Sequence, residues 1–177
     1  EMVAPHYEKH YDLPCPQIHY LQVHPSLAFR QIITQKPYPV KAIITAASNP
    51  VMWAPDTRNV LEALTHPNLD LHVVLDYWMT PTAQLADYVL PAASWLERPL
   101  CSTIEDWYPV VLGGERAIEP IGDRHEDYQF WRDLGIRLDQ GEYWPWKNLE
   151  EVHRYQISQL GISYEEYIEK GMLFSSE

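Results

Sequence analysis

The sequence has little from which a metal or iron–sulfur site could be built. Its 177 residues include only two cysteines, Cys15 and Cys101, which are far apart and form no Cys-x-x-Cys pair. This excludes a cluster or zinc site made of cysteines from this chain, whereas a disulfide between the two stays open. We therefore expect no metal ligands among these residues.

The sequence also lacks a membrane-spanning or targeting segment. No apolar run is long enough to span a bilayer, and no charged region followed by an apolar stretch opens the chain. Because the chain begins with Glu1 rather than with methionine, we expect its true start to lie elsewhere. An export signal would then stand outside this sequence, so the compartment, cytoplasmic or periplasmic, stays open.

Positive charge is scarce. Lysine and arginine number 13 against 25 aspartates and glutamates, which gives a formal net charge of -12 at pH 7. Such a charge argues against a nucleic-acid backbone or an anionic membrane as the partner. One bound nucleotide is still compatible with it, because loop amides and a few cations suffice for one phosphate group. A hydrolase is not indicated, since the chain has no Gly-x-Ser-x-Gly turn.

The first half of the chain alternates apolar helices and strands. Hydrophobic residues make up 46% of the sequence, enough for a packed core. Helix signals at Pro25, Asp56 and Thr80 each precede an apolar strand pattern, and these strands cover Val40–Ala47, Leu71–Asp76 and Tyr88–Pro91. This order predicts an α/β fold of three layers, Rossmann-like and doubly wound, with a mainly parallel sheet; the first strand should be buried on both faces.

The second half has a different pattern. Gly113-Gly114 indicates a turn between extended segments 108–112 and 116–119. Helices are expected over 128–138, from the cap Asn148 through 160, and after the capping box that starts at Ser163. We predict an extended arm over 1–23, an α/β nucleotide-binding domain over 24–140 and a helical extension over 141–177, packed as a single compact unit.

Two predicted strand ends carry the candidate binding residues. In open parallel sheets, ligands bind where the carboxyl ends of the strands meet helix N-termini. The first strand is followed by Ser48, Asn49 and Pro50, and the second ends on Leu75 and Asp76. Small residues let a ligand approach the backbone, and a carboxylate accepts hydrogen bonds from a guanine edge or from ribose hydroxyls. A turn or a helix cap explains the same residues without any ligand.

The segment that follows resembles one family. Residues 80–97 read Thr-x-Thr-Ala-x-x-Ala-Asp-x-Val-Leu-Pro-Ala-Ala-x-Trp-x-Glu, after an Asn-Pro loop and a strand ending in Asp. Together with the motifs Ala-Ile-Glu-Pro at 117–120 and Glu-Asp-Tyr-x-x-Trp at 126–131, this resembles the molybdopterin oxidoreductase family, the group of dimethyl sulfoxide reductase, formate dehydrogenase and nitrate reductase. The likeness covers roughly residues 40–138. Within this run, Trp95 is expected in the core.

The resemblance implies a role for this domain. Relatives use it to hold the guanosine end of a molybdopterin guanine dinucleotide that carries molybdenum or tungsten. The resemblance assigns cofactor contacts to Ser48, Asn49, Pro50, Leu75 and Asp76, with two further residues, Arg98 near phosphate and Asp127 at a helix start. The family glycine before Ser-Asn-Pro is Ala47 here.

The resemblance also implies that other parts are needed. Iron–sulfur ligands, the metal ligand and a second pterin-binding domain belong to segments that this sequence does not contain, so the chain alone should be inactive. Its partners are then the remaining domains of the parent enzyme and an electron-transfer subunit, with self-association through exposed aromatic residues also open. The alternative is a non-catalytic scaffold or assembly subunit derived from the same fold, and a generic flavodoxin-like nucleotide binder is a further hypothesis.

Overall fold

The structure, a computed structural model, describes residues 25–103 and 110–174. The chain forms two compact units, residues 1–90 and 91–177. The sequence predicts boundaries at 23/24 and 140/141 within one compact body, whereas the boundary between the two units lies at 90/91. The predicted arm over 1–23 lies outside the described residues, as does Cys15. The thiol of Cys101 is free.

The first unit contains a sheet of three strands in the order β1-β2-β3. They are β1 (Ala42–Ala46), β2 (Leu71–Asp76) and β3 (Tyr88–Pro91). β1 and β2 run parallel, with Ala42 opposite Leu71 and Ala46 opposite Leu75. The predicted α/β fold class with a parallel sheet is confirmed.

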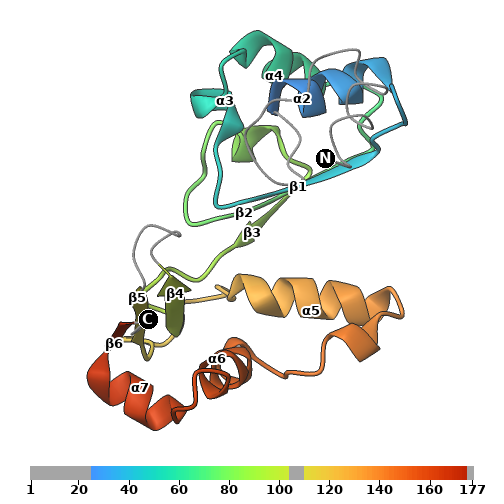
Figure 1. Cartoon of the computed structure of the whole chain (residues 1–177). Coiled ribbons are helices and arrows are strands. Elements are labelled where there is room, and N and C mark those ends of the chain that lie inside the picture. Colours follow the sequence, from blue (N-terminus) through green and yellow to red (C-terminus); the bar gives the residue numbers. More distant parts are fainter. Residues whose placement is uncertain (1–24, 104–109, 175–177) are drawn as a thin grey trace. The chain divides into compact units, whose positions relative to one another are not determined.

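Helices of this unit supply its apolar core. They are α2 (Pro25–Thr34), α3 (Pro50–Trp53) and α4 (Thr57–Leu64), and Figure 1 draws α2 and α4 next to each other. Asp56 caps α4 as predicted, since its carboxylate accepts a hydrogen bond from the Asn59 amide at 3.1 Å. The buried side chains between the helices and the sheet are Phe29, Ile32, Ala54, Val60, Ala63 and Leu64.

Two details of the first unit differ from the prediction. β1 is less buried than predicted: only Thr45 is buried in it, whereas β2 has four buried residues in a row. In the strand order that the structure describes, β1 stands at the end and has a neighbouring strand on one side, whereas β2 lies between two strands. The helix expected after Thr80 is a single 3-10 turn, η1 (Ala83–Leu85). It stays short because Asp87 already accepts a hydrogen bond from the His72 amide at 2.7 Å, which leaves few residues before β3.

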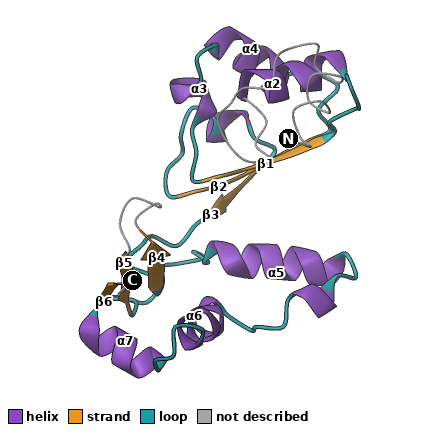
Figure 2. Cartoon of the chain, in the orientation of Figure 1, coloured by secondary structure: helices purple, strands orange, loops and turns teal. Residues whose placement is uncertain are grey.

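The second unit contains an antiparallel sheet in the order β4-β5-β6 (Figure 2). Its strands are β4 (Leu100–Thr103), β5 (Val110–Gly114) and β6 (Met172–Phe174). The predicted turn at Gly113-Gly114 is wrong, because both glycines belong to β5. A Cβ atom at Gly113 would overlap the ring of Tyr167, so the glycine permits a close approach rather than a turn.

Within the described part of the second unit, three α-helices and a 3-10 turn accompany the sheet. They are α5 (Asp127–Arg137), η3 (Gly141–Tyr143), α6 (Leu149–Ser158) and α7 (Tyr164–Lys170). The predicted caps are present: Asn148 accepts from the Glu151 amide at 2.9 Å and Ser163 from the Glu166 amide at 3.0 Å. α7 ends at a glycine in the left-handed conformation, Gly171, with φ of 65°.

The aromatic residue assigned to the core is exposed. Trp95 has 63% of its surface accessible, which contradicts the prediction. The segment around it is anchored by its neighbours instead. Ala92 and Ala93 are buried, and the buried carboxylate of Glu97 accepts from the Ser94 amide at 2.7 Å and from the Ile121 amide at 2.9 Å. With these contacts holding the backbone, the indole side chain is left at the surface of this unit.

Candidate functional site

The loop after β1 leaves the sheet through a left-handed residue. The amide of Ala47 donates to the Leu75 carbonyl at 3.0 Å and so extends the pairing of β1 with β2 by one residue. Its φ of 49° then turns the chain away from the sheet. Glycine adopts this conformation without steric cost. The left-handed backbone is thus a physical reason for glycine at this position in the related motif.

Asn49 joins the two strand-end loops. Its side-chain oxygen accepts a hydrogen bond from the Thr82 hydroxyl at 2.7 Å, and the same hydroxyl accepts from the Val51 amide at 3.2 Å. Thr82 is completely buried. These bonds tie the loop after β1 to the loop after β2. The amide nitrogen of Asn49 has no bond of its own among the described residues, so it is the group that a ligand can use.

The end of β2 presents one carboxylate. Leu75 is buried, and its carbonyl is used by Ala47 within the sheet. Asp76 is half-buried, and its Oδ1 accepts a hydrogen bond from the Trp78 amide at 3.2 Å, which closes a turn. Its Oδ2 makes no hydrogen bond in the part of the chain that the structure describes. The second oxygen of Asp76 is therefore available to donors of a bound molecule.

Exposed apolar side chains flank these polar groups in the sequence. Five such residues, all at least 38% exposed, lie in α3 or directly after β2: Met52, Trp53, Tyr77, Trp78 and Met79. The indole Nε1 of Trp53 donates to the Ser48 hydroxyl at 2.9 Å. Sequence reasoning missed Trp53 and Thr82, because neither the hydroxyl pairing nor the exposure has a signature in the order of residues.

The remaining predicted residues belong to the second unit. The structure brings Ser48, Asn49, Pro50, Leu75 and Asp76 together in the first unit. Arg98 and Asp127 stand in the other unit, Arg98 before β4 and Asp127 as the first residue of α5.

Arg98 lies in a partly buried polar region. Its Nε atom is buried without a hydrogen-bond partner among the described residues. Burial raises the pKa of the neighbouring Glu126, while the charges of Arg116 and Arg98 oppose that rise. Burial, followed by the charge of Arg98, lowers the pKa of His153 to about 4. The charge of Arg98 thus opposes the rise in the pKa of Glu126 and contributes to the lowered pKa of His153. Its Nε–H remains as a hydrogen-bond donor without a partner among the described residues.

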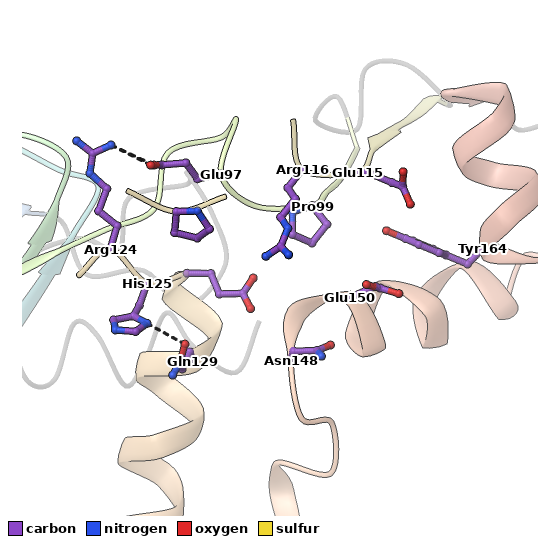
Figure 3. A pocket seen from close by; sticks show the side chains of 12 residues that line it. Glu97, Pro99, Glu115, Arg116, Arg124, His125, Gln129, Asn148, Glu150 and Tyr164 are labelled. Carbon is purple, nitrogen blue, oxygen red and sulfur yellow. Dashed lines mark hydrogen bonds and ion pairs between the residues drawn. The ribbon is translucent and has the colours of Figure 1, made fainter. Parts of the chain in front are cut away.

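A cavity of about 510 Å³ opens in the same unit (Figure 3). Glu97 forms part of its wall and pairs with Arg124 at 3.0 Å. Backbone amides of Ser94 and Ile121, followed by the side chains of Ser94 and Arg124, hold the pKa of Glu97 down at about 2, against the effect of burial. This carboxylate is fully engaged within the protein, so we assign it to stability. Arg116 also lines the cavity and pairs with Glu119 at 2.6 Å.

The described residues contain neither a metal-binding cluster nor a membrane-spanning helix. No cluster of three or more histidine, cysteine, aspartate or glutamate side chains is arranged to hold a metal ion there. No helix in the described ranges has the length and apolar character needed to cross a membrane.

Comparison with known proteins gives consistent matches. The family model described as molybdopterin oxidoreductase matches residues 20–137. The chain is 43% identical over 143 residues to the acetylene hydratase of Syntrophotalea acetylenica, which covers 81% of this chain and 19% of that protein. It is 32% identical over 166 residues to the molybdopterin-containing subunit of thiosulfate reductase from Salmonella typhimurium, covering 92% of this chain and 22% of that protein.

A solved structure agrees with these matches. The acetylene hydratase from Pelobacter acetylenicus aligns with a TM-score of 0.82 and 36% identity, over 98% of this chain and 24% of that chain. The chain therefore spans about a fifth to a quarter of the length of these relatives.

Proposed function

The chain belongs to the molybdopterin oxidoreductase family, and we propose that it holds the guanosine end of a molybdopterin guanine dinucleotide at the carboxyl ends of β1 and β2. The observation that carries this proposal is the carboxylate of Asp76 at the end of a parallel strand, with Oδ1 fixed by the Trp78 amide and Oδ2 unused among the described residues. Guanine presents N–H donors on its base-pairing edge, and a carboxylate is a matching acceptor.

The neighbouring loop supports the same ligand. The Asn49 oxygen is occupied by Thr82, so the amide nitrogen is left as a donor for a base or ribose oxygen. Ser48 accepts a hydrogen bond from the Trp53 indole, and Pro50 begins α3. Leu75 sets the position of the loop through the carbonyl that accepts from the Ala47 amide. In this proposal Asn49 and Asp76 contact the ligand directly, while Leu75 positions the backbone.

Arg98 and Asp127, in the second unit, are the further predicted cofactor contacts. Arg98 keeps a buried donor without a partner among the described residues, and a guanidinium is suited to phosphate oxygens. Asp127 begins α5, and its carboxylate is half-buried. We assign Arg98 to the phosphate part of the dinucleotide and Asp127 to its polar surroundings, in the assembled parent protein.

The reaction itself belongs to the parent protein. Family membership implies a molybdenum or tungsten pterin cofactor, and that cofactor supplies the redox chemistry while protein groups bind and orient it. We propose that this chain alone is inactive, that an iron–sulfur cluster and the metal ligand are contributed by other segments of the parent, and that its partners are those domains and an electron-transfer subunit.

A nucleotide-binding measurement tests the proposal without the pterin. Calorimetric titration of the 177-residue chain with GMP and GDP should give binding that is selective over AMP and that is lost in Asp76→Ala. Glu119→Ala, which changes a carboxylate with 76% side-chain exposure in the other unit, is the matched control and should bind as the wild type does. Equal affinity for AMP and GMP would instead support a generic nucleotide-binding fold, and no binding would refute a half-site that functions within this chain.

A further inference from the structure

We infer that Trp53 is the stacking platform for the guanine base, and that Ser48 positions its ring. This inference rests on the proposed function, because it names a further residue of the same nucleotide site. Trp53 combines high exposure with a fixed ring. Trp53 is 54% exposed, yet its indole Nε1 is held by the Ser48 hydroxyl at 2.9 Å. The polar edge of the ring is therefore satisfied while much of the side chain stays accessible.

The backbone that carries Trp53 is also fixed. Trp53 is the last residue of α3, and its amide donates to the Asn49 carbonyl at 3.2 Å. α3 begins with the buried Pro50, and the Val51 amide is bound to the buried Thr82 hydroxyl. An aromatic ring on such a rigid element loses little conformational freedom when a ligand stacks on it.

The register of the sheet places this ring at the same end as Asp76. Ala46 is opposite Leu75, and the bond from Ala47 to the Leu75 carbonyl extends the pairing by one residue. Ser48 is the next residue in the loop after β1, and Asp76 is the last residue of β2. Since Ser48 holds the indole, the ring and the carboxylate border the same strand ends. The carboxylate can bind the polar edge of a guanine while the indole faces its plane.

Trp78 is the competing aromatic residue. It is 74% exposed and follows Asp76 in the turn after β2. Its backbone amide is bound to Asp76, but its indole nitrogen has no hydrogen bond among the described residues. Trp78 thus has the exposure of a platform without a contact that orients its ring. Trp53 is the better candidate, because its ring is oriented by the hydrogen bond to Ser48.

Calorimetry with GMP and IMP on the 177-residue chain separates stacking from edge recognition. IMP lacks the 2-amino group of guanine but has the same purine plane. Stacking on an aromatic side chain corresponds to roughly 5- to 150-fold in affinity. Trp53→Leu should therefore weaken GMP and IMP by the same factor, at least about fivefold. Trp53→Phe should keep most of the affinity, Ser48→Ala should weaken both nucleotides by a smaller factor, and Trp78→Leu should change neither.

The outcomes distinguish the two proposals. If GMP binding is lost in Asp76→Ala but unchanged in Trp53→Leu, the stacking role is refuted and the proposed function stands. If Trp78→Leu weakens binding and Trp53→Leu does not, the platform has been assigned to the wrong residue. If the wild-type chain binds neither nucleotide, the proposed site fails and the stacking role fails with it. Far-ultraviolet circular dichroism of each variant checks that the exposed substitution leaves the fold intact.

Discussion

His153 should make the second unit sensitive to mild acid. It lies in α6, is only 5% exposed, and its Nδ1 atom has no hydrogen-bond partner among the described residues. Burial, with the positive charge of Arg98 as the second cause, lowers its pKa to about 4 from the usual 6.5. A protonated imidazolium at this position would be buried and close to another cation.

The size of the effect follows from proton linkage. The unfolded chain binds a proton at His153 more tightly than the folded chain does, so the free energy of unfolding falls as the pH falls from 6.5 toward 4. At about 1.4 kcal/mol per pKa unit, the full shift corresponds to roughly 3 kcal/mol, of which about 2 kcal/mol is lost at pH 5. Above pH 6.5 the folded state keeps all of this stability.

Urea unfolding at pH 7.5 and pH 5.0 measures this difference, with amide hydrogen exchange in α6 as a local readout. His153→Leu cannot titrate, so its loss of stability between the two pH values should be smaller than that of the wild type by about 2 kcal/mol. Arg98→Met removes the second cause and should reduce the pH dependence in part. An identical pH dependence in the wild type and in His153→Leu would refute the reasoning, whatever their absolute stabilities.

Three further substitutions test the packing described above. Gly113→Ala should lower the free energy of unfolding in a urea titration by about 1–3 kcal/mol, because its Cβ would meet the Tyr167 ring. Gly114→Ala is the matched control: its Cβ would have no atom within 4 Å, so its free energy of unfolding should fall by clearly less. Thr82→Val should lower the unfolding free energy by about 1–3 kcal/mol, since the Asn49 oxygen and the Val51 amide lose the same partner; a thermal midpoint equal to that of the wild type would contradict this. Ala47→Gly should raise stability by up to about 1 kcal/mol in chemical denaturation, because relief of the left-handed backbone exceeds the entropy cost of glycine, and a net loss would show that the alanine is not strained.

The elements of the first unit were predictable because local signals agreed with the packing. Each local signal there predicts one kind of element, and the structure contains that element. The signals are the Asp56 cap of α4, the apolar run of β2 and the prolines around α2. The second unit was harder. Gly113-Gly114 is a turn signal in a sequence, but the partner that requires glycine there is Tyr167, more than fifty residues later. Such long-range steric demands leave no trace in local patterns.

Trp95 shows the same limit in the opposite direction. A tryptophan within an apolar motif favours a core position, yet the core here is formed by Ala92 and Ala93, and the anchor is the ionised Glu97. A carboxylate is buried only when its oxygens are satisfied, and the partners of Glu97 include the Ile121 amide and the Arg124 side chain from a later segment. The motif could identify the family, but it could not tell which of its side chains face inward.

At the candidate site, the sequence motif and the hydrogen bonds of the structure together decide how a variant should be interpreted. The motif indicated Asn49 as a ligand residue, and the structure adds that its side-chain oxygen already holds Thr82. Loss of nucleotide binding in Asn49→Ala would therefore follow either from a missing ligand contact or from a loosened loop. Asp76 is the better probe of ligand binding. Its only hydrogen bond among the described residues is with the Trp78 amide, within an exposed turn, and it does not join the two loops. A binding defect in Asp76→Ala with an unchanged thermal midpoint would then report on the ligand contact itself.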